Sequence, residues 1–256
     1  MAGVGPLTIA VLIKQVPDMN AIRIDRATGQ IVPSAQLGMS SYDEYAVEAA
    51  LQLKEAQGGE VIAVTAGPAS ARDVITRALA MGADRGIHLE LADPSATDTL
   101  GIAMLLVDAI RPLACDLVIA GQTSDDLESG QVGAQVAELL GTPVISNVVN
   151  VEIDEGQMVV RRDMEDGYQT VRSTLPAVLL SSTGLEQPRL PSLKGIMAAK
   201  KKPVESFAVN APPERRIAWE APYVPAKTIS GTIVQDVPAA EAARLLVSWL
   251  REQKLI

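Results

Sequence analysis

The chain has 256 residues, of which 48% are hydrophobic but only 3% aromatic, and its formal net charge is −9. The length suffices for one large domain or two modest ones, and a core of Ala, Val, Ile and Leu suits helices packed on a parallel sheet. The acidic balance argues against a nucleic-acid-binding protein, which normally carries a basic surface.

The sparse cysteine and histidine content excludes further classes of site. A single cysteine, Cys115, excludes an internal disulfide and a cysteine metal cluster, and a single histidine, His88, argues against a Ser-His-Asp triad or a histidine metal site. No apolar run reaches the roughly 18 residues that a membrane-spanning helix needs, and the N-terminus lacks a secretory pattern. We therefore expect a soluble intracellular protein, not embedded in a membrane and without a metal site.

The first part of the chain alternates strands and helices. Residues 7–14 form an apolar run of strand length, and residues 21–32 alternate around a Thr28-Gly29 turn as a hairpin does. Residues 41–56 predict a helix, because Ser41 and Glu44 form a capping-box pattern before an apolar stripe. Further strands are expected at 60–68, 84–91, 116–121 and 143–153, and further helices at 70–83, 98–112 and 129–141.

This alternation predicts an α/β fold with a parallel sheet. In such sheets a ligand lies beyond the carboxyl ends of the strands. Three segments occupy that edge here, namely the turn after Lys14, residues 65–70 and residues 121–126, and all are rich in small or hydroxyl residues. Small residues let a ligand approach the backbone closely, so this edge is the expected binding site.

The pattern changes after residue 150. Residues 157–182 predict a strand, an Asp166-Gly167 turn, a second strand and a buried strand, which we expect to extend the edge of the sheet as a hairpin. Periodicity then fades, and the proline-rich residues 186–205 and 210–227 predict irregular structure. A last amphipathic helix is expected at 238–255.

The loop at residues 121–133, "GQTSDDLESGQVG", follows a predicted strand and leads into a predicted helix. Its glycines and hydroxyls suggest a phosphate site, although it has three aspartate or glutamate residues before Ser129 and no lysine or arginine. Backbone N–H groups of such a turn and of a helix start can hold a phosphate without basic side chains. The carboxylates suit a ribose or adenine edge, or the capping of the helix expected to begin near Ser129. The alternative is a solvated loop and cap.

Four stretches in order resemble the β subunit of electron transfer flavoproteins. They are "IKQVPD" from Ile13, "SSYDEYAVEAALQLKE" from Ser40, "ALAMGADRGIHL" from Ala78, and "VRRDMEDGYQTVRSTLPAVLLSS" from Val160 with the segment after it. Each motif alone is weak, but four at the right spacing are specific, and the resemblance covers residues 7–206.

The resemblance implies a nucleotide-binding, Rossmann-type core like that of the adenine nucleotide α-hydrolases, with an antiparallel hairpin extension and an irregular C-terminal arm. It implies a heterodimer with an α subunit that holds most of one redox-active FAD. The dimer would carry electrons from acyl-CoA or related dehydrogenases, as in fatty acid β-oxidation, to a quinone oxidoreductase or similar acceptor. The β chain is then an electron-carrier subunit without catalytic residues, in a bacterial or archaeal cytoplasm or in the mitochondrial matrix of a eukaryote.

The resemblance also implies the residues of an adenine-nucleotide site in this chain. Leu12 and Ala66 match positions that line an adenosine pocket, and Tyr42 matches an aromatic that approaches the FAD of the α subunit. Ser-Ser at 40–41 replaces the family's Asn-Pro. The full expected set is Leu12, Ser40, Ser41, Tyr42, Asp43, Ala66, Thr123, Ser124, Asp125, Asp126, Ser129, Gly130, Gln131, Val132 and Gly133.

Two identities of the bound nucleotide stay open. AMP is found in ordinary members, whereas electron-bifurcating members hold a second FAD in this subunit. Gln131-Val132-Gly133 is similar to the bifurcating pattern, but Ala134 replaces its proline, and Gln122 stands where both patterns have a basic residue. Ser124-Asp125-Asp126 resembles a third group, usually non-bifurcating, so AMP is favoured.

A second implied surface docks the partner dehydrogenase. Leu193 matches the family's apolar anchor, with Ile196 and Met197 beside it, and Lys200 opens a basic run at 200–202 that suits acidic partners. The alternative for that run is a solvated charge cluster.

The expected organisation is a nucleotide-binding domain at 1–183, a recognition loop at 184–206 and an arm at 207–256. Apolar Ile217, Trp219 and Tyr223 in the arm, and Trp249 in the last helix, predict packing on the α subunit. A nucleotide-binding protein of the universal-stress type shares a related core, but it should lack both the loop and the arm.

Overall fold

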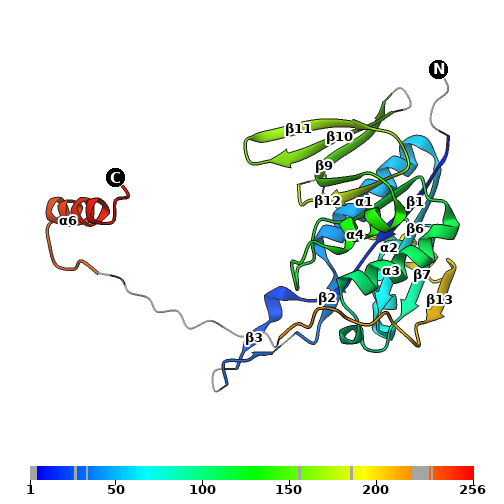
Figure 1. Cartoon of the computed structure of the whole chain (residues 1–256), viewed down its shortest axis with the longest axis horizontal. Helices are drawn as coiled ribbons and strands as arrows, with labels where there is room; N and C mark the ends of the chain where they lie inside the picture. Colours follow the sequence, from blue (N-terminus) through cyan, green and yellow to red (C-terminus); the bar gives the residue numbers. More distant parts are fainter. Residues whose placement is uncertain are drawn as a thin grey trace. The chain divides into compact units, whose positions relative to one another are not determined.

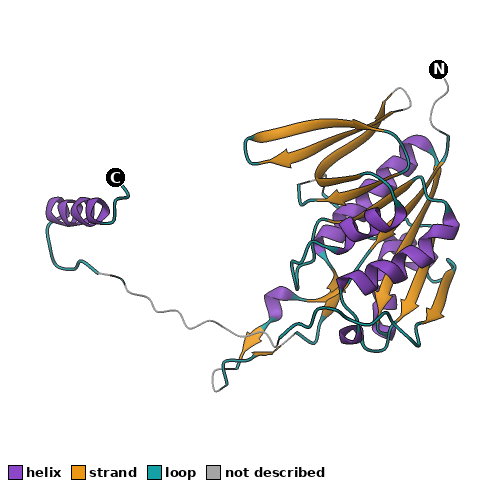
Figure 2. Ribbon diagram, viewed as in Figure 1, coloured by secondary structure: helices purple, strands orange, loops and turns teal. Residues whose placement is uncertain are grey.

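The computed structural model describes residues 5–25, 28–32, 34–154, 157–184, 187–220, 231 and 233–256. The chain divides into two compact units, residues 1–222 and residues 223–256. The first unit is built on a nine-stranded sheet flanked by helices (Figure 2). The second contains the helix α6 (Ala239–Glu252). Within the described ranges, no helix is both long and apolar enough to cross a membrane.

The large sheet has the strand order β11-β10-β9-β12-β8-β1-β6-β7-β13. Its parallel strands are β1 (Leu7–Leu12), β6 (Gly59–Gly67), β7 (Arg85–Glu90), β8 (Leu117–Gly121), β12 (Ala177–Ser181), β13 (Val204–Ala208) and β9 (Val144–Asp154). An antiparallel extension adds β10 (Gln157–Met164) and β11 (Gly167–Ser173) beyond β9. Figure 1 shows this extension at one edge of the sheet and β13 beside β7 at the other.

Two small ribbons lie in the connection after β1. They pair β2 (Gln15–Pro17) with β5 (Leu37–Met39), and β3 (Arg23–Ile24) with β4 (Ile31–Val32). The second ribbon confirms the hairpin predicted around Thr28-Gly29. Short 3-10 turns occur at Met19–Ala21, Ala69–Ala71, Pro94–Ala96 and Arg111–Leu113.

Helices cover both faces of the large sheet, and the alternation of side chains along each strand makes two cores. Ile9 and Val11 of β1 point to a core formed with α1 (Ser41–Gln57), α2 (Arg72–Met81) and the short α5 (Leu193–Ala199). Ala10 and Leu12 point to the opposite core, formed with α3 (Thr99–Ile110) and α4 (Val132–Leu140). The scarcity of aromatic residues is therefore compatible with a fully packed aliphatic interior.

The predicted order of strands and helices is confirmed through Ser181, and the last helix is confirmed as α6. The expected edge hairpin needs one correction. β10 and β11 do lie at the edge, but the buried strand after them, β12, inserts between β9 and β8. All five side chains of β12 are buried, which suits an inner strand rather than an edge.

The prediction of irregular structure at 186–205 is wrong. That segment contains α5 and the start of β13, which pairs with β7 from Val204 to Ala208. Both elements are short, and most of their residues are exposed, so they lack the apolar periodicity that would mark them in the sequence.

The predicted start of α1 at Ser41 is confirmed, but its predicted capping box and the predicted start of α4 need correction. The N-cap of α1 is Ser40 and makes no side-chain cap hydrogen bond, so Ser41 and Glu44 do not form a capping box. Glu44 instead pairs with Arg77 of α2. α4 begins at Val132, three residues after the predicted start near Ser129, because Gly130 has a left-handed φ of 60° that a helix cannot include.

Candidate functional site

The loops that follow β1 and β8 meet at the carboxyl edge of the sheet. These two strands are neighbours, with Leu12 paired to Ala120. The chain leaves β1 toward α1 on one face and leaves β8 toward α4 on the other. Diverging connections leave a crevice between adjacent strand ends, which is where parallel α/β sheets bind ligands. We call this place the β1/β8 crevice.

Asp43 joins the two sides of the β1/β8 crevice from the first turn of α1. Its Oδ2 accepts a hydrogen bond from the backbone N–H of Lys14 at 2.7 Å, and its Oδ1 accepts from the N–H of Gly121 at 3.1 Å. The side chain is buried, and this burial raises the pKa of Asp43 to about 7, although the two N–H donors and Lys14 act in the opposite direction. Asp43 therefore fixes the ends of β1 and β8 relative to each other.

Asp125 caps a helix, but not the one predicted. Its Oδ2 accepts from the backbone N–H of Ser41 at 2.6 Å, and its Oδ1 accepts from the Ser41 hydroxyl at 2.7 Å. The loop after β8 thus supplies the acid that complements the N-terminal end of α1. Of the two roles expected for the loop acids, Asp125 fills the capping role, but at α1 and not at α4, which has no side-chain cap; the role at a ribose or adenine edge stays a prediction.

Asp126 binds the one cation that reaches this loop in the described hydrogen bonds. Its Oδ1 accepts from Lys14 Nζ at 2.7 Å, from the Ser124 hydroxyl at 2.7 Å and from the N–H of Leu127 at 2.9 Å. Sequence reasoning missed Lys14 as a site residue, because it lies 112 positions from Asp126. Its place directly after the first predicted strand, at the expected binding edge, was the available signal.

The remaining residues of the loop fix its end on the sheet and on α3. The Gln131 side chain accepts from the Thr99 hydroxyl at 2.8 Å. A Cβ on Gly133 would lie 2.3 Å from Leu180 Cδ2, so this glycine serves close packing of α4 on β12. Ser129 and Val132 are half-buried, and Val132 packs against the α3/α4 core.

Leu12, Ala66 and Tyr42 border the β1/β8 crevice in different ways. Leu12 is buried and Ala66 is half-buried, and both belong to the α3/α4 side of the sheet. Tyr42 lies against the end of β8, since a Cβ on Gly121 would come within 2.8 Å of Tyr42 Cβ. The predicted set therefore gathers at one edge of the sheet, contributed by β1, β6, the start of α1 and the loop after β8.

Several donors at this edge remain open. The hydroxyls of Ser40 and Thr123 are buried and have no hydrogen-bond partner among the described residues. The first N–H groups of α4 lack intrahelical acceptors and a side-chain cap. Buried hydroxyls and helix N–H groups are donors for a phosphate or ribose oxygen. The edge can therefore hold a polar, anionic ligand, because its own acids are bonded to other groups of the protein.

The predicted docking residues lie away from the crevice, near the amino ends of the parallel strands. α2 connects the parallel strands β6 and β7, so it runs from the carboxyl edge back to the amino edge. α5 contacts its far end, because a Cβ on Gly195 would come within 2.3 Å of the Ala80 carbonyl oxygen. Leu193, Met197 and Ile196 are exposed, by 75%, 65% and 46%, and Lys200 is exposed as well.

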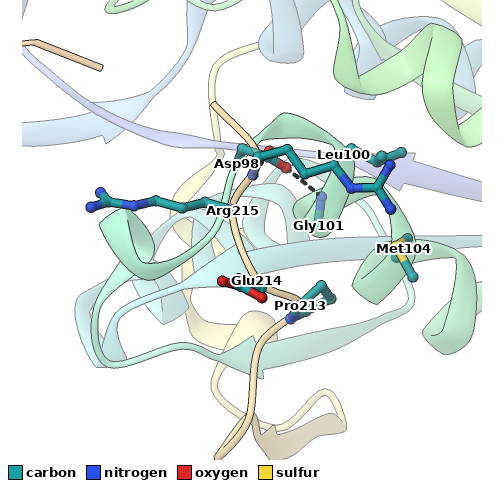
Figure 3. Close-up of a pocket in the computed structure, with 8 residues that line it drawn as sticks. Asp98, Leu100, Gly101, Met104, Pro213, Glu214 and Arg215 are labelled. Carbon is teal, nitrogen blue, oxygen red and sulfur yellow. Dashed lines mark hydrogen bonds between the residues drawn. The ribbon is translucent and has the colours of Figure 1, made fainter. Parts of the chain in front are cut away.

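A further cavity of about 420 Å³, which the sequence did not predict, lies at the start of α3 (Figure 3). It is bordered by Leu100 and Met104 on one side and by residues 213–216 on the other. Asp98 closes it by accepting hydrogen bonds from the N–H groups of Gly101 at 3.0 Å and Arg216 at 2.7 Å. These N–H donors lower the pKa of Asp98. The carboxylate thereby holds the beginning of the C-terminal arm on α3.

The described residues contain no cluster of histidine, cysteine and acidic side chains suited to a metal ion. Cys115 is half-buried, and burial raises the pKa of its thiol to about 11. Neither observation adds a chemical group to the β1/β8 crevice.

Comparison with known proteins gives a consistent result. A family model described as the electron transfer flavoprotein domain matches residues 28–212. The electron transfer flavoprotein subunit beta of Syntrophomonas wolfei is 38% identical, over 96% of each chain. The protein of the same description in Bacillus subtilis is 35% identical, over 96% of this chain and 98% of the relative. The caffeyl-CoA reductase-Etf complex subunit CarD of Acetobacterium woodii is 34% identical, over 98% of this chain and 100% of the relative.

Proposed function

The chain belongs to the electron transfer flavoprotein family, as a β subunit, and on that premise we propose that it binds AMP in the β1/β8 crevice and pairs with an α subunit that holds most of the FAD. The resulting heterodimer accepts electrons from acyl-CoA or related dehydrogenases and passes them to a quinone oxidoreductase or a similar acceptor. The flavin supplies the redox chemistry, and this chain supplies binding and orientation. We place it in the cytoplasm of a bacterium or archaeon.

The observation that carries the nucleotide proposal is a pair of buried hydroxyls, Ser40 and Thr123, which have no hydrogen-bond partner in the described part of the chain and lie at the crevice where β1 and β8 diverge. A buried hydroxyl without a partner costs free energy unless a ligand or water satisfies it. The open N–H groups of α4 lie at the end of the same loop and suit the phosphate. Leu12 and Ala66 supply the apolar wall that an adenine ring needs.

Lys14 adds the charge that the loop itself lacks. The Lys14 side chain is 42% exposed while it pairs with Asp126 and Ser124, so it can turn toward a phosphate without giving up a buried contact. We infer that Lys14 and the α4 N–H groups share the phosphate, and that Asp43, Asp125 and Asp126 hold the loop that presents them.

A second candidate is a β subunit that holds its own FAD and acts in electron bifurcation. The loop motif Gln131-Val132-Gly133 favours it, and one relative is by name a subunit of a caffeyl-CoA reductase-Etf complex. Against it, Ala134 replaces the proline that follows this motif in the bifurcating pattern, and Ser124-Asp125-Asp126 resembles a group that is usually non-bifurcating.

The direct experiment is nucleotide extraction from the purified αβ heterodimer, with flavin and adenine nucleotides counted per dimer. We expect one FAD and one AMP. Two FAD per dimer would overturn the AMP assignment in favour of the second candidate. One FAD without any second nucleotide would overturn the nucleotide site itself.

We further propose that the exposed apolar residues of α5, with Leu193 as the anchor and Lys200 beside it, dock the partner dehydrogenase. The arm at 207–256 packs on the α subunit, since α6 leaves Leu246 and Trp249 exposed by 56% and 48% and Trp219 of the arm is exposed by 57%. Tyr223, which was expected to join this contact, lies outside the described residues. In this proposal residues 1–183 form the nucleotide-binding domain and residues 184–206 the docking segment.

A further inference from the structure

The docking segment contains a formed helix that is too short to be stable alone. α5 has seven residues, whereas isolated helices below about 12–15 residues are marginal in water. Its N-cap is Ser192, whose hydroxyl accepts from the N–H of Gly195 at 3.0 Å. One cap is worth about 1 kcal/mol, so contacts with the rest of the fold must hold the helix.

Arg189 fastens the chain three residues before this cap. Its backbone N–H and its Nε donate to Glu48 Oε2 at 3.0 and 2.8 Å, and its Nη2 donates to Glu48 Oε1 at 2.9 Å. Its guanidinium also binds Glu55, which lies further toward the C-terminal end of α1. Arg189 thus spans two acids of α1 with a planar fork that fixes both position and direction.

Because Glu48 is buried, its ion pair with Arg189 contributes to the stability of the segment. Exposed ion pairs contribute little to stability, but the Glu48 side chain is only 6% exposed. The hydrogen bonds from Arg189 lower the pKa of Glu48 although burial acts to raise it. Loss of Arg189 would leave the buried Glu48 carboxylate without its cationic partner and with the hydrogen bond from Gln52, which is strongly unfavourable.

Lys202 fastens the chain three residues after α5. Its Nζ donates to the carbonyl oxygens of Leu79 at 2.9 Å and Ala83 at 2.5 Å, at the C-terminal end of α2. A lysine at this end satisfies open carbonyls and complements the helix dipole. Between these two anchoring residues, Arg189 and Lys202, Ala199 is buried and Gly195 lies against Ala80.

The outward side of the segment is then presented in one fixed arrangement. Leu190 is 83% exposed, more than Leu193 and Met197. Leu190 directly follows Arg189, so the same contact that holds the segment also places this leucine. Leu193 and Met197, four residues apart, lie on one face of α5, and Leu190 lies three residues before the helix in the segment that leads into it.

We propose that Arg189 and Lys202 are positioning residues of the docking surface and that Leu190 is a second apolar contact beside Leu193. The partner has an apolar depression that receives these leucines. Arg189 and Lys202 order α5 before the partner arrives, so the partner does not have to bear the cost of ordering it. This inference rests on the proposed docking function.

The test uses the αβ heterodimer as electron acceptor for an acyl-CoA dehydrogenase that oxidises butyryl-CoA, with the heterodimer concentration varied. For Arg189→Met we expect KM for the heterodimer to rise about 5–20-fold and kcat to stay within about twofold, because ordering affects binding and not electron transfer. Amide hydrogen exchange at 195–199 should accelerate at least about tenfold as α5 frays. The matched control is Arg77→Met, which breaks the Arg77–Glu44 pair between α1 and α2 without touching α5.

A second variant separates positioning from loss of stability. Arg189→Met combined with Glu48→Gln removes the stranded carboxylate, so the protein should unfold near the wild-type temperature while KM stays raised. Leu190→Ala should raise KM about threefold or more with no change in hydrogen exchange.

The measurements distinguish a wrong docking function from a wrong positioning role. If Leu193→Ala leaves KM unchanged, the docking function proposed for α5 is wrong. If Leu193→Ala raises KM but the stable Arg189 double variant has wild-type KM and wild-type exchange at 195–199, the positioning role is wrong and docking stands. If Lys202→Met behaves like Arg77→Met in both measurements, the positioning role of Lys202 is wrong.

Discussion

The β1/β8 crevice and α5, the helix proposed to dock the partner, lie at opposite ends of the parallel strands and use polar contacts differently. At the crevice the acids Asp43, Asp125 and Asp126 are turned inward and hold the same loops that would touch a ligand. At α5 the residues that hold the segment, Arg189 and Lys202, differ from the leucines that face outward.

This difference predicts different consequences of substitution. At the crevice, support and recognition share the same backbone, so a change there should alter stability and ligand binding together. At α5 the two roles belong to separate side chains, so an apolar residue can be removed with no effect on the fold. The first arrangement suits a nucleotide that stays bound, and the second suits a partner that must leave quickly.

The largest effect is expected from Gly121→Ala at the end of β8. A Cβ there would lie 2.5 Å from Asp43 Oδ1, 2.8 Å from Tyr42 Cβ and 2.9 Å from the Thr123 carbonyl oxygen. Because backbone and a buried carboxylate surround it, we expect the free energy of unfolding to fall by about 3 kcal/mol, and bound nucleotide to be lost from the purified heterodimer. Denaturant unfolding and nucleotide extraction measure the two effects.

The control for that substitution is Gly38→Ala on β5, where a Cβ meets nothing within 4 Å. It should change the free energy of unfolding by less than about 0.5 kcal/mol. Equal effects of the two alanines would remove the distinction between the crevice and an ordinary surface ribbon.

Asp43→Asn should change how stability depends on pH. The folded-state pKa of Asp43, about 7, is raised above its ordinary value, so the folded form holds the proton more tightly than the unfolded form. Between about pH 4 and pH 7 this group therefore makes the free energy of unfolding fall as pH rises, by on the order of 1 kcal/mol per pH unit. The variant should lack that contribution, which urea titrations at several pH values detect.

The matched control is Asp108→Asn, an exposed aspartate on α3. A difference curve between wild type and Asp43→Asn that does not differ from the control's curve between pH 4 and pH 7 would mean that Asp43 does not join the two strand ends as a buried carboxylate.

Lys14→Met should weaken nucleotide binding by about 3–10-fold, since it removes one charge-assisted contact from a partly exposed site. The substitution also removes the contacts of Lys14 with Asp126 and Ser124, which keep their hydrogen bond to each other. Isothermal titration of nucleotide-depleted heterodimer with AMP measures the change. Lys54→Met, which breaks the pair with Asp84 at the other end of α1, should leave AMP affinity as it is; an equal loss in both variants would argue for a general stability effect.

The smallest effect on the fold is expected at α5. Leu190→Ala and Leu193→Ala should each change the free energy of unfolding by less than about 0.5 kcal/mol, because these side chains are 83% and 75% exposed. Thermal unfolding of the heterodimer checks this. A loss above about 1.5 kcal/mol would place the leucines in an internal contact of the dimer and would end the contrast between the two regions.

The order of strands and helices could be read from the sequence because each element carries its own period. Continuous apolar runs marked β1, β6, β8 and β12, and glycines marked the ends of α2 and α4. The motifs quoted from Ile13 to Glu205 identified the right family. Their order and spacing can be read from the sequence without knowing which residues are in contact. The sheet edge expected to hold a ligand followed from the same parallel order.

What only the tertiary structure decided are the pairings between segments far apart in the chain. The bond of Asp125 to Ser41 joins residues 84 positions apart, and that of Lys14 to Asp126 joins residues 112 apart. No local pattern distinguishes a loop acid that caps its own helix from one that caps another. α5 and β13 were missed for the same reason. Their stability comes from contacts with α1, α2 and β7. Periodicity and propensity are local properties of the sequence and do not indicate such contacts.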